Sequence, residues 1–368
     1  MASTQQLPAE YNALLFHATD KPLELTKLPF PTATAGSAVI QVLSLGIMSY
    51  SREVLTGKRP YPYPAPYTPG AGCVGRVVTV GPDATTLRPG ELVLADVYLV
   101  ARDDTNSRCL QGVHQGGTAG SARLVENEWR HGSWAEYAKV PLENCHRLPD
   151  DGRSVNDWIN MSLMLIPFGG MTNDGGLDLR PGESVVIAPA TGQFSGAGVE
   201  IALAMGAKVV ALGRNLDSLK KLKEGLSEYG PRLRTVQITG DAEADAKAIG
   251  PVDCYFDISP PTAGNSTHMK SCFQALKPKG RVCFMGGLQG DVSIPHGKIY
   301  RQNITITGKW MYEPDAATKL IKMADAGLLN LGRYTCEEYP LEQWSQAVEN
   351  AGEKAKWGQL TVMKPSPA

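Results

Sequence analysis

The sequence predicts an α/β protein in which a doubly wound parallel sheet is combined with a second, β-rich domain. A strand–turn–helix–strand unit at 185–215 is the first observation that predicts this fold. The second is the alternation of short apolar runs with helical segments from residue 180 onward, which is typical of a parallel sheet with helices on both faces. The third is the strand-rich first part of the chain, where Gly and Pro separate β-type runs.

The unit at 185–215 has the length and composition of a dinucleotide-binding unit. A β-branched run at 185–187 predicts a buried strand, and a nearly apolar helix follows at 196–205. Between them, Gly192 allows a tight turn and Gly196 lets the helix and the strand approach closely. The exposed N–H groups at the start of the helix suit a pyrophosphate. A strict GxGxxG pattern is absent, so this signal is weak on its own.

The residues after the second strand of this unit indicate which dinucleotide binds. An NAD site usually has Asp or Glu there to bind the ribose hydroxyls, whereas this chain has Gly213-Arg214-Asn215. Gly213 leaves room, and the guanidinium of Arg214 can bind a 2′-phosphate through two parallel hydrogen bonds. The alternative interpretation makes Arg214 a solvated residue at the end of a strand. The position of Arg214 favours NADPH as the cofactor.

The composition excludes several classes of partner. The chain of 368 residues has 36 Lys and Arg against 37 Asp and Glu, so it offers no electrostatic basis for binding nucleic acid or an anionic membrane. No apolar run is long enough to span a membrane, and the first residues lack the pattern of a signal peptide. The seven cysteines form no CxxC pair, which favours free thiols in a reducing compartment. We therefore expect a cytoplasmic protein.

Two further features concern the organisation of the chain. Residues 102–132 form a polar segment that is too long for an ordinary connection, so they are either a mobile lobe or a packed excursion near a site. Leu216, Leu219, Leu222 and Leu226 have the spacing of an apolar helix face. The predicted strands are 37–45, 75–81, 91–100, 134–140, 184–188, 208–212, 235–239, 252–258, 281–285, 304–310, 333–339 and 359–363.

Several short motifs are spread across the chain. They are Gly46-Ile47, Pro69-Gly70, the runs at 75–81, 88–93 and 132–137, and Lys279-Gly280-Arg281-Val282 before Met285-Gly286-Gly287. With these motifs, the chain resembles almost end to end the medium-chain dehydrogenase/reductase superfamily of zinc alcohol dehydrogenases and quinone oxidoreductases. The resemblance implies a chaperonin-10-like (GroES-like) catalytic domain at 1–167, a Rossmann dinucleotide-binding domain at 168–313, and a return to the catalytic domain over 314–368. It also allows a homodimer paired through the strand at 304–310.

The chain departs from this superfamily at the zinc sites. Zinc members have Cys where this chain has Met48, a His-Glu pair where it has Ala71-Gly72, and a third ligand at about Phe168. Because a catalytic zinc needs three protein ligands of N, S or O type, we predict that this metal is absent. The lobe that carries four cysteines for a structural zinc in those members has only Cys109 here, so we predict no structural zinc either.

The predicted loss of zinc affects the reaction that we expect. Without a Lewis acid, hydride from NADPH requires a small-molecule acceptor that is already electron-poor. A C=C conjugated to a carbonyl (an enone, enoyl group or quinone) meets this requirement, because hydrogen bonds can hold the enolate oxygen. The alternatives are a carbonyl or imine reductase or alcohol dehydrogenase, and a non-redox enzyme or binding protein on the same scaffold. His114 and His131 have no metal-ligand spacing and are interpreted as surface residues.

Tyr50 is the candidate proton donor, because it stands where zinc members have the Ser or Thr that relays a proton. The alternative is that Tyr50 is a wall of the pocket. Glu53 is interpreted either as a tuning or relay group or as an exposed carboxylate at a helix end, and Tyr61, Tyr63 and Tyr67 as part of a stiff Pro-rich loop, next to the substrate or purely structural. The residues assigned to the cofactor are Thr172, Thr191, Gly192, Phe194, Ser195, Gly213, Arg214, Asn215, Asp257, Ser259, Gly286, Gly287, Trp310 and Lys356.

Overall fold

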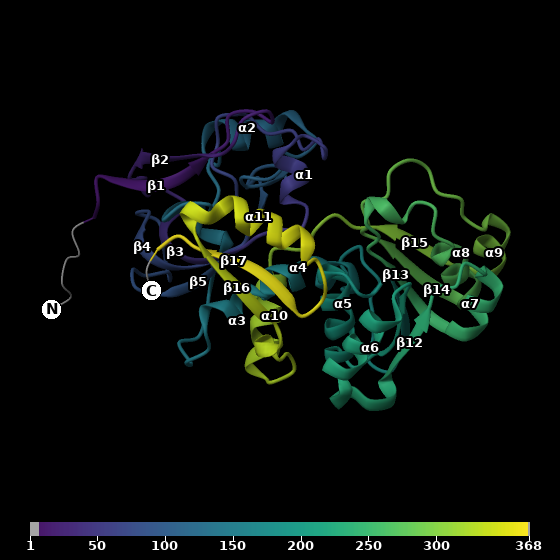
Figure 1. Ribbon diagram of the computed structural model, residues 1–368. Coiled ribbons are helices and arrows are strands. Elements are labelled where there is room, and N and C mark those ends of the chain that lie inside the picture. The colour runs from purple at the N-terminus through teal and green to yellow at the C-terminus, as the bar shows by residue number, and fades with distance from the viewer. Residues whose placement is uncertain (1–6, 367–368) are drawn as a thin grey trace. The chain divides into compact units, whose positions relative to one another are not determined.

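The computed structural model describes residues 7–366, which form two compact units (Figure 1). One unit contains the chain up to Ser162 together with Thr335–Ala355 and the segment from Gln359 onward, and the other contains Leu163–Tyr334 and Lys356–Gly358. The first is β-rich and the second is built on a parallel sheet, so the predicted fold class is confirmed. The boundaries predicted from the motifs, after residues 167 and 313, differ from these divisions.

The unit that contains Leu163–Tyr334 has a six-stranded sheet in which all neighbouring strands are parallel. The strand order is β12-β11-β10-β13-β14-β15, so the chain starts in the middle at β10, moves to one edge and then crosses to β13. In such sheets, ligands bind outside the carboxyl ends of the strands at this reversal. The strands are β10 (Ser184–Ala188), β11 (Lys208–Gly213), β12 (Leu233–Gln237), β13 (Val252–Asp257), β14 (Leu276–Phe284) and β15 (Thr305–Gly308).

The helices of this unit follow from their apolar residues. Helix α5 (Gln193–Ala204) is buried on nearly all sides, because its residues are almost all small or apolar. Helix α6 (Leu216–Gly225) buries Leu219 and Leu222, whereas Leu216 of the same predicted apolar face is 59% exposed. The other helices are α7 (Ala242–Ile249), α8 (His268–Ala275), α9 (His296–Gln302) and α10 (Ala316–Asp325), with short 3₁₀ turns at Ser227–Arg232, Pro261–Ala263 and Leu331–Arg333.

The β-rich unit is organised around β3 (Ser37–Gly46), which pairs with β4, β8 and β17. The main sheet has the order β16-β17-β3-β4-β5-β9, so it joins strands from both parts of the sequence. Ile40, Leu45 and Trp134 lie in its core. The other strands are β1 (Glu10–Leu15), β2 (Glu24–Pro29), β4 (Cys73–Val80), β5 (Leu92–Ala95), β6 (Tyr98–Val100), β7 (Arg108–Leu110), β8 (Tyr137–Pro141), β9 (Cys145–Arg147), β16 (Thr335–Pro340) and β17 (Gln359–Lys364).

Few helices accompany these strands. They are α1 (Ser51–Leu55), α2 (Ala119–Asn127), α3 (Val155–Ile159) and α11 (Trp344–Glu353), with 3₁₀ turns at Leu142–Asn144 and Leu341–Gln343; α4 (Met161–Met171) runs across the division between the units. Within residues 7–366, no helix has the length and apolar character needed to cross a membrane.

The polar segment 102–132 is a packed excursion. Its β7 and α2 contribute Cys109 and Val125 to a small apolar core that also contains Leu99 and Trp129. Helix α2 is capped by Thr118, whose side chain accepts a hydrogen bond from the helix backbone. Apolar packing and a capped helix therefore hold this lobe together, which decides between the two interpretations of the sequence.

Four strands, β1, β2, β7 and β9, are not predicted by the sequence, and the predicted strand 91–100 is interrupted. The interruption occurs at Asp96, whose carboxylate accepts a hydrogen bond from the N–H of Tyr98 (2.9 Å) and lies 2.6 Å from Nε2 of His146. Strand β15 lies at an edge of the parallel sheet, and the homodimer through this edge stays a prediction.

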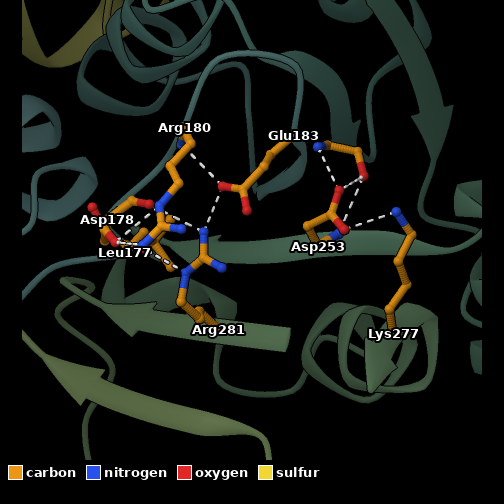
Figure 2. Close-up of polar contacts among 8 residues, drawn as sticks. Leu177, Asp178, Arg180, Glu183, Asp253, Lys277 and Arg281 are labelled. Carbon is orange, nitrogen blue, oxygen red and sulfur yellow. Dashed lines mark hydrogen bonds and ion pairs between the residues drawn. The ribbon is translucent and has the colours of Figure 1, made fainter. Parts of the chain in front are cut away.

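A polar network joins the amino ends of three strands of the parallel sheet (Figure 2). Arg281 of β14 donates to the carboxylate of Glu183 (2.5 Å), and Asp253 of β13 accepts from the N–H (2.8 Å) and hydroxyl (2.7 Å) of Ser184. Partial burial disfavours the charge of Asp253, but hydrogen bonds from Lys277 and Ser184 outweigh it and lower the pKa of Asp253 to about 2. Since this edge is opposite the carboxyl ends, the network stabilises the sheet without being part of a ligand site.

Candidate functional site

The turn between β10 and α5 has the geometry of an anion-binding helix start. Gly192 is the N-cap of α5, and its N–H donates to Oγ of Ser195 (3.0 Å). Ser195 is buried and its hydroxyl shapes the turn, and its contact with a cofactor stays a prediction. The first backbone N–H groups of α5 have no partner within the helix and suit a pyrophosphate. Phe194, the second residue of the helix, is half-buried.

A second segment of the same unit borders this turn. The N–H of Trp357 donates to the carbonyl of Thr191 (3.3 Å). A Cβ on Gly196 would lie 2.4 Å from Cβ of Trp357, so only glycine allows this contact. Lys356 precedes Trp357 and is exposed. The structure therefore brings the predicted base close to the predicted phosphate turn, although 165 residues separate Thr191 from Lys356 in the sequence.

The end of β11 lies beside this turn. A Cβ on Gly213 would lie 3.4 Å from Cγ2 of Thr191. Arg214 is exposed, and within residues 7–366 no group accepts a hydrogen bond from its guanidinium. Its carbonyl accepts from Nε2 of Gln237 (3.2 Å), which fixes the backbone there. The Oδ1 of Asn215 accepts from the N–H of Ser218 (2.8 Å), so this side chain caps α6.

The turns after β13 and β14 are bonded to each other through their backbones. The N–H of Gly287 donates to the carbonyl of Ser259 (2.8 Å), and a Cβ on Gly286 would lie 2.6 Å from the nitrogen of Ser259. Asp257 and Ser259 are each 1% exposed. Their polar atoms bond within the protein, so they hold the turn, which differs from the direct cofactor contact that the sequence predicts.

Two predicted cofactor residues lie apart from these turns. Thr172 follows α4, and its hydroxyl donates to the carbonyl of Gly169 (3.1 Å), so it closes the end of that helix. Trp310 is 45% exposed and lies two residues after β15. The cofactor roles of both residues stay predictions.

The carboxyl edge of the parallel sheet fits a dinucleotide. Gly192 and Gly196 provide a turn that a side chain would fill, and the end of β11 has an unpaired guanidinium at Arg214 where NAD sites have a carboxylate. Lys356 adds a second positive charge near the glycine turn. These groups can hold the two phosphates of a dinucleotide and a further phosphate on its ribose.

In the β-rich unit, Tyr50 lies directly before α1 and is half-buried. The central guanidinium carbon of Arg59 lies 4.3 Å from the centre of the Tyr50 ring, and Arg59 is held by Glu53 through Nε (3.0 Å) and Nη2 (2.9 Å). Desolvation raises the pKa of Tyr50 above its usual value, the neighbouring Tyr61 raises it further, and Arg59 opposes both. Glu53 therefore positions Arg59 over the phenol.

The Pro-rich loop contributes one residue to this cluster and two to the structure of the unit. The ring of Tyr61 meets Tyr50 edge-on at 6.1 Å, and His114 of the lobe at 4.8 Å. The Oη of Tyr63 accepts from the N–H of Gly112 (2.7 Å), and Tyr67 is buried. The loop is thus both structural and a neighbour of Tyr50.

The two histidines of the lobe have different surroundings. His131 is exposed, as predicted, and its Nδ1 accepts from the N–H of Thr68 (3.2 Å). The prediction that His114 is a surface residue is wrong, because it is half-buried against Tyr61, and burial lowers its pKa.

Where zinc members have a Cys ligand, this chain has the half-buried Met48, whose thioether is a poor zinc ligand. The other positions of the zinc ligands do not fit a metal either. A Cβ on Gly72 would lie 2.7 Å from Cβ of Ser162, so no ligating side chain fits there, and Ala71 and Phe168 are buried apolar residues. In the part of the chain that the structure describes, no group of three His, Cys, Asp or Glu residues could hold a metal ion. Cys109 lies in the apolar core of the lobe, where burial raises its pKa to about 12.

The fold and the dinucleotide-type edge define the class of two-domain nicotinamide oxidoreductases. Residues 34–150 match the family described as "Alcohol dehydrogenase GroES-like domain", and residues 195–326 match "Zinc-binding dehydrogenase". The chain therefore belongs to the medium-chain dehydrogenase/reductase superfamily.

Curated relatives and solved structures agree with this assignment. The chain is 24% identical over 310 residues to L-threonine 3-dehydrogenase of Anaeromyxobacter sp. (strain Fw109-5), covering 80% of this chain and 83% of that protein. It is 25% identical to L-arabinitol 4-dehydrogenase of Talaromyces emersonii, covering 80% and 75%. Its fold is similar to that of a cobalt- and zinc-bound alcohol dehydrogenase from Pyrobaculum aerophilum, with a TM-score of 0.74, 20% identity and coverage of 97% and 100%.

Three residues near these sites are not predicted by the sequence. Arg59 stands in an ordinary basic stretch, Trp357 is a lone aromatic residue near the end of the chain, and His268 begins a short helix. The neighbour of Trp357, Lys356, is the one signal that points to its segment. The partners of Arg59 and His268 become visible only when the chain is folded.

Proposed function

We propose that this protein is an NADP-dependent oxidoreductase that interconverts a carbonyl group and an alcohol on a small molecule, with Tyr50 in place of zinc as the proton donor and acceptor. The observation that carries the proposal is the half-buried phenol of Tyr50 under the guanidinium of Arg59, in a chain whose zinc positions do not fit a metal. The threonine and arabinitol dehydrogenases among its relatives support an alcohol–carbonyl reaction better than the conjugated C=C that the sequence favours.

The cofactor is held by the parallel-sheet unit. When bound, the nicotinamide supplies or accepts the hydride. The N–H groups at the start of α5 and the ammonium of Lys356 bind the pyrophosphate, and Arg214 binds the 2′-phosphate through two parallel hydrogen bonds. This assignment is supported by the exposed guanidinium of Arg214 and by the contact that links the segment of Lys356 to Thr191.

Tyr50 supplies the proton that carbonyl reduction consumes. Reduction develops negative charge on the carbonyl oxygen, and a phenol can donate a hydrogen bond and then a proton to that oxygen. Desolvation raises the pKa of Tyr50, so the phenol is protonated at neutral pH but gives up its proton less readily than a solvated phenol. The positive charge of Arg59, 4.3 Å from the ring centre, stabilises the phenolate that remains.

Reduction of a C=C conjugated to a carbonyl is the second candidate function. The specific observation that favours it is the absence of room for a zinc ligand at Gly72, since an unpolarised carbonyl accepts hydride less readily than an activated C=C. Tyr50 would then stabilise the enolate oxygen instead of the alkoxide. An imine is a third acceptor for the same groups.

Steady-state kinetics with Tyr50→Phe test the proposal. The oxidation of NADPH is followed with panels of ketones, aldehydes, enones, quinones and imines, and the reduction of NADP⁺ with secondary alcohols and polyols. With the best substrate, Tyr50→Phe keeps the ring but removes the acid, so kcat should fall by about 10²–10⁴ while the Kd for NADPH stays unchanged. Tyr67→Phe, in a buried tyrosine of the same loop region, is the matched control and should keep its rate.

The outcomes separate the candidates. Turnover of enones without turnover of ketones or alcohols would replace the proposal by the second candidate. A wild-type rate in Tyr50→Phe would show that Tyr50 is only a wall of the pocket. NADPH binding without turnover of any acceptor would favour a non-redox enzyme or a binding protein.

A further inference from the structure

A buried polar cluster lies behind the turn that follows β13, in the parallel-sheet unit. It consists of Tyr255 and Asp257 of the strand, Ser259 of the turn and His268 at the start of α8. None of these residues is more than 1% exposed. Buried polar groups of this kind are costly unless they are bonded to one another, so their arrangement is informative.

The carboxylate of Asp257 is the common acceptor of the cluster. Its Oδ2 accepts from Oη of Tyr255 (2.5 Å) and from Oγ of Ser259 (2.9 Å), and it lies 3.1 Å from Nε2 of His268. The same Nε2 lies 2.9 Å from Oγ of Ser259. Because the hydroxyls of Tyr255 and Ser259 already donate to Oδ2, the hydrogen bonds of the cluster are complete when Nε2 of His268 carries a hydrogen and donates it to Ser259 and Asp257. The Nδ1 of His268 has no hydrogen-bond partner within residues 7–366, so His268 bonds to the cluster through Nε2.

The cluster is connected to the two turns at the carboxyl edge of the sheet. The Oδ1 of Asp257 accepts from the N–H of Ser259 (3.1 Å). The carbonyl of Ser259 in turn accepts from the N–H of Gly287 (2.8 Å), and the carbonyl of Asp257 from the N–H of Met285 (2.8 Å). One carboxylate therefore sets the backbone after β13, and that backbone sets the turn after β14.

We propose that His268 is a positioning residue for the dinucleotide: by donating from Nε2 to Ser259 and Asp257, it fixes the two turns whose backbone faces the cofactor. The inference rests on the proposed function, because it assumes that a nicotinamide cofactor binds at this edge. His268 is fully buried, so it acts through Asp257 and Ser259 and does not touch the cofactor. Removing its hydrogen bond loosens the turns and weakens cofactor binding.

Two substitutions of His268 separate the role of Nε2 from that of bulk. In His268→Gln the amide nitrogen reaches about as far as Nε2, whereas in His268→Asn it reaches only to the position of Nδ1. Fluorescence titration of each variant with NADPH and with NADH should give a Kd about tenfold higher for His268→Asn and within about threefold of the wild type for His268→Gln. The ratio of the two Kd values, which depends on Arg214, should stay unchanged in both.

Ser271→Ala is the matched control. Ser271 is a fully buried residue of the same helix, and its hydroxyl donates to the carbonyl of Thr267 (3.1 Å) without contacting Asp257. The control should keep the wild-type Kd even if its melting temperature falls. A general loss of stability, seen as a lower melting temperature, would therefore not explain a raised Kd in His268→Asn alone.

The proposal would be overturned by a folded His268→Asn variant with the wild-type Kd, or by equal losses in the Asn and Gln variants. If His268→Asn does not fold, Tyr255→Phe decides, since it removes another donor to the same Oδ2 and keeps the ring. A Kd raised severalfold supports the proposal, and an unchanged Kd overturns it. A wild-type protein that binds neither nicotinamide cofactor would overturn the proposed function together with this inference.

Discussion

Arg214 lies directly after β11, and its guanidinium is exposed. A bidentate contact with a 2′-phosphate contributes about 1.5–3 kcal/mol, or roughly tenfold to a hundredfold in affinity. We expect Arg214→Ala to weaken NADPH binding by this factor and to leave NADH binding nearly unchanged, as measured by titration with both cofactors. Lys220→Ala, an exposed cation on the adjacent α6, is the control. Equal affinity of the wild type for NADPH and NADH would contradict the prediction.

Single residues differ in how far the sequence predicts their role. Arg214 is predictable because its role depends on its place at the end of a strand, and strand ends can be read from local patterns. Arg59 and His268 are not, because Arg59 acquires its role from a ring nine residues away and His268 from a carboxylate on another element. For Asp257 and Ser259, the sequence predicts the position at a strand end but not the burial of the two residues.

Among the elements, α5 is nearly all apolar but contains one buried acidic residue, Glu200. Glu200 is fully buried; its Oε1 lies 3.2 Å from Nε of Arg333, and its Oε2 lies 3.5 Å from Oη of Tyr334. Desolvation raises the pKa of Glu200 to about 7, although the charge of Arg333 and a hydrogen bond from it oppose this rise. Helix α5, which begins at the predicted phosphate turn, is therefore anchored by a carboxyl group that titrates near neutral pH.

This anchor predicts how stability depends on pH. Because the pKa of Glu200 is higher in the folded chain than its usual value of 4.5, the folded state binds a proton that the unfolded state has lost. Its contribution to stability is complete below about pH 4.5 and is lost as the pH rises to about 7, a decrease of about 3 kcal/mol. We expect Glu200→Gln to remove this part of the decrease in the free energy of unfolding, measured by urea denaturation from pH 5 to 8.

Glu228→Gln is the control for this measurement, because Glu228 is an exposed second partner of Arg333. The control should retain most of the pH dependence of the wild type, because the charge of Glu228 is the smallest of the causes that shift the pKa of Glu200. The same slope in Glu200→Gln as in the wild type would show that the pKa of Glu200 does not differ between the folded and unfolded states, which would contradict the prediction.

At the scale of the whole molecule, the sequence predicts the fold class and most strands, because periodicity and glycine punctuation are local signals that survive folding. It does not predict β1, β2, β7 and β9, which are short or partly exposed strands without a clear apolar alternation. It leaves the state of the 102–132 lobe open, because the small core that includes Cys109 and Trp129 joins residues far apart in the chain. The same is true of the candidate site. The sequence predicts the glycine turn, but it does not predict that Arg59 lies over the ring of Tyr50.

The metal content is a property of the whole molecule, because zinc-containing members bind one zinc ion for catalysis and another in the lobe. Here no ligating side chain fits at Gly72, Ala71 and Phe168 offer no ligand atom, and the lobe is held by apolar packing around Cys109. We therefore expect purified protein to contain no stoichiometric zinc by elemental analysis. A chelator should change neither the melting temperature nor the turnover with NADPH, because neither the lobe nor the chemistry depends on a metal.

The alcohol dehydrogenase of Pyrobaculum aerophilum, whose structure contains cobalt and zinc, is the comparison for this experiment, since it has a similar fold at a TM-score of 0.74. Treated in parallel, it reports whether the chelator removes metal under the conditions used. About one zinc per chain in the present protein, or activity that a chelator abolishes and zinc restores, would contradict the prediction and would return the proton chemistry from Tyr50 to a metal. Zinc-free turnover that Tyr50→Phe abolishes would instead assign the acid of the reaction to the phenol of Tyr50.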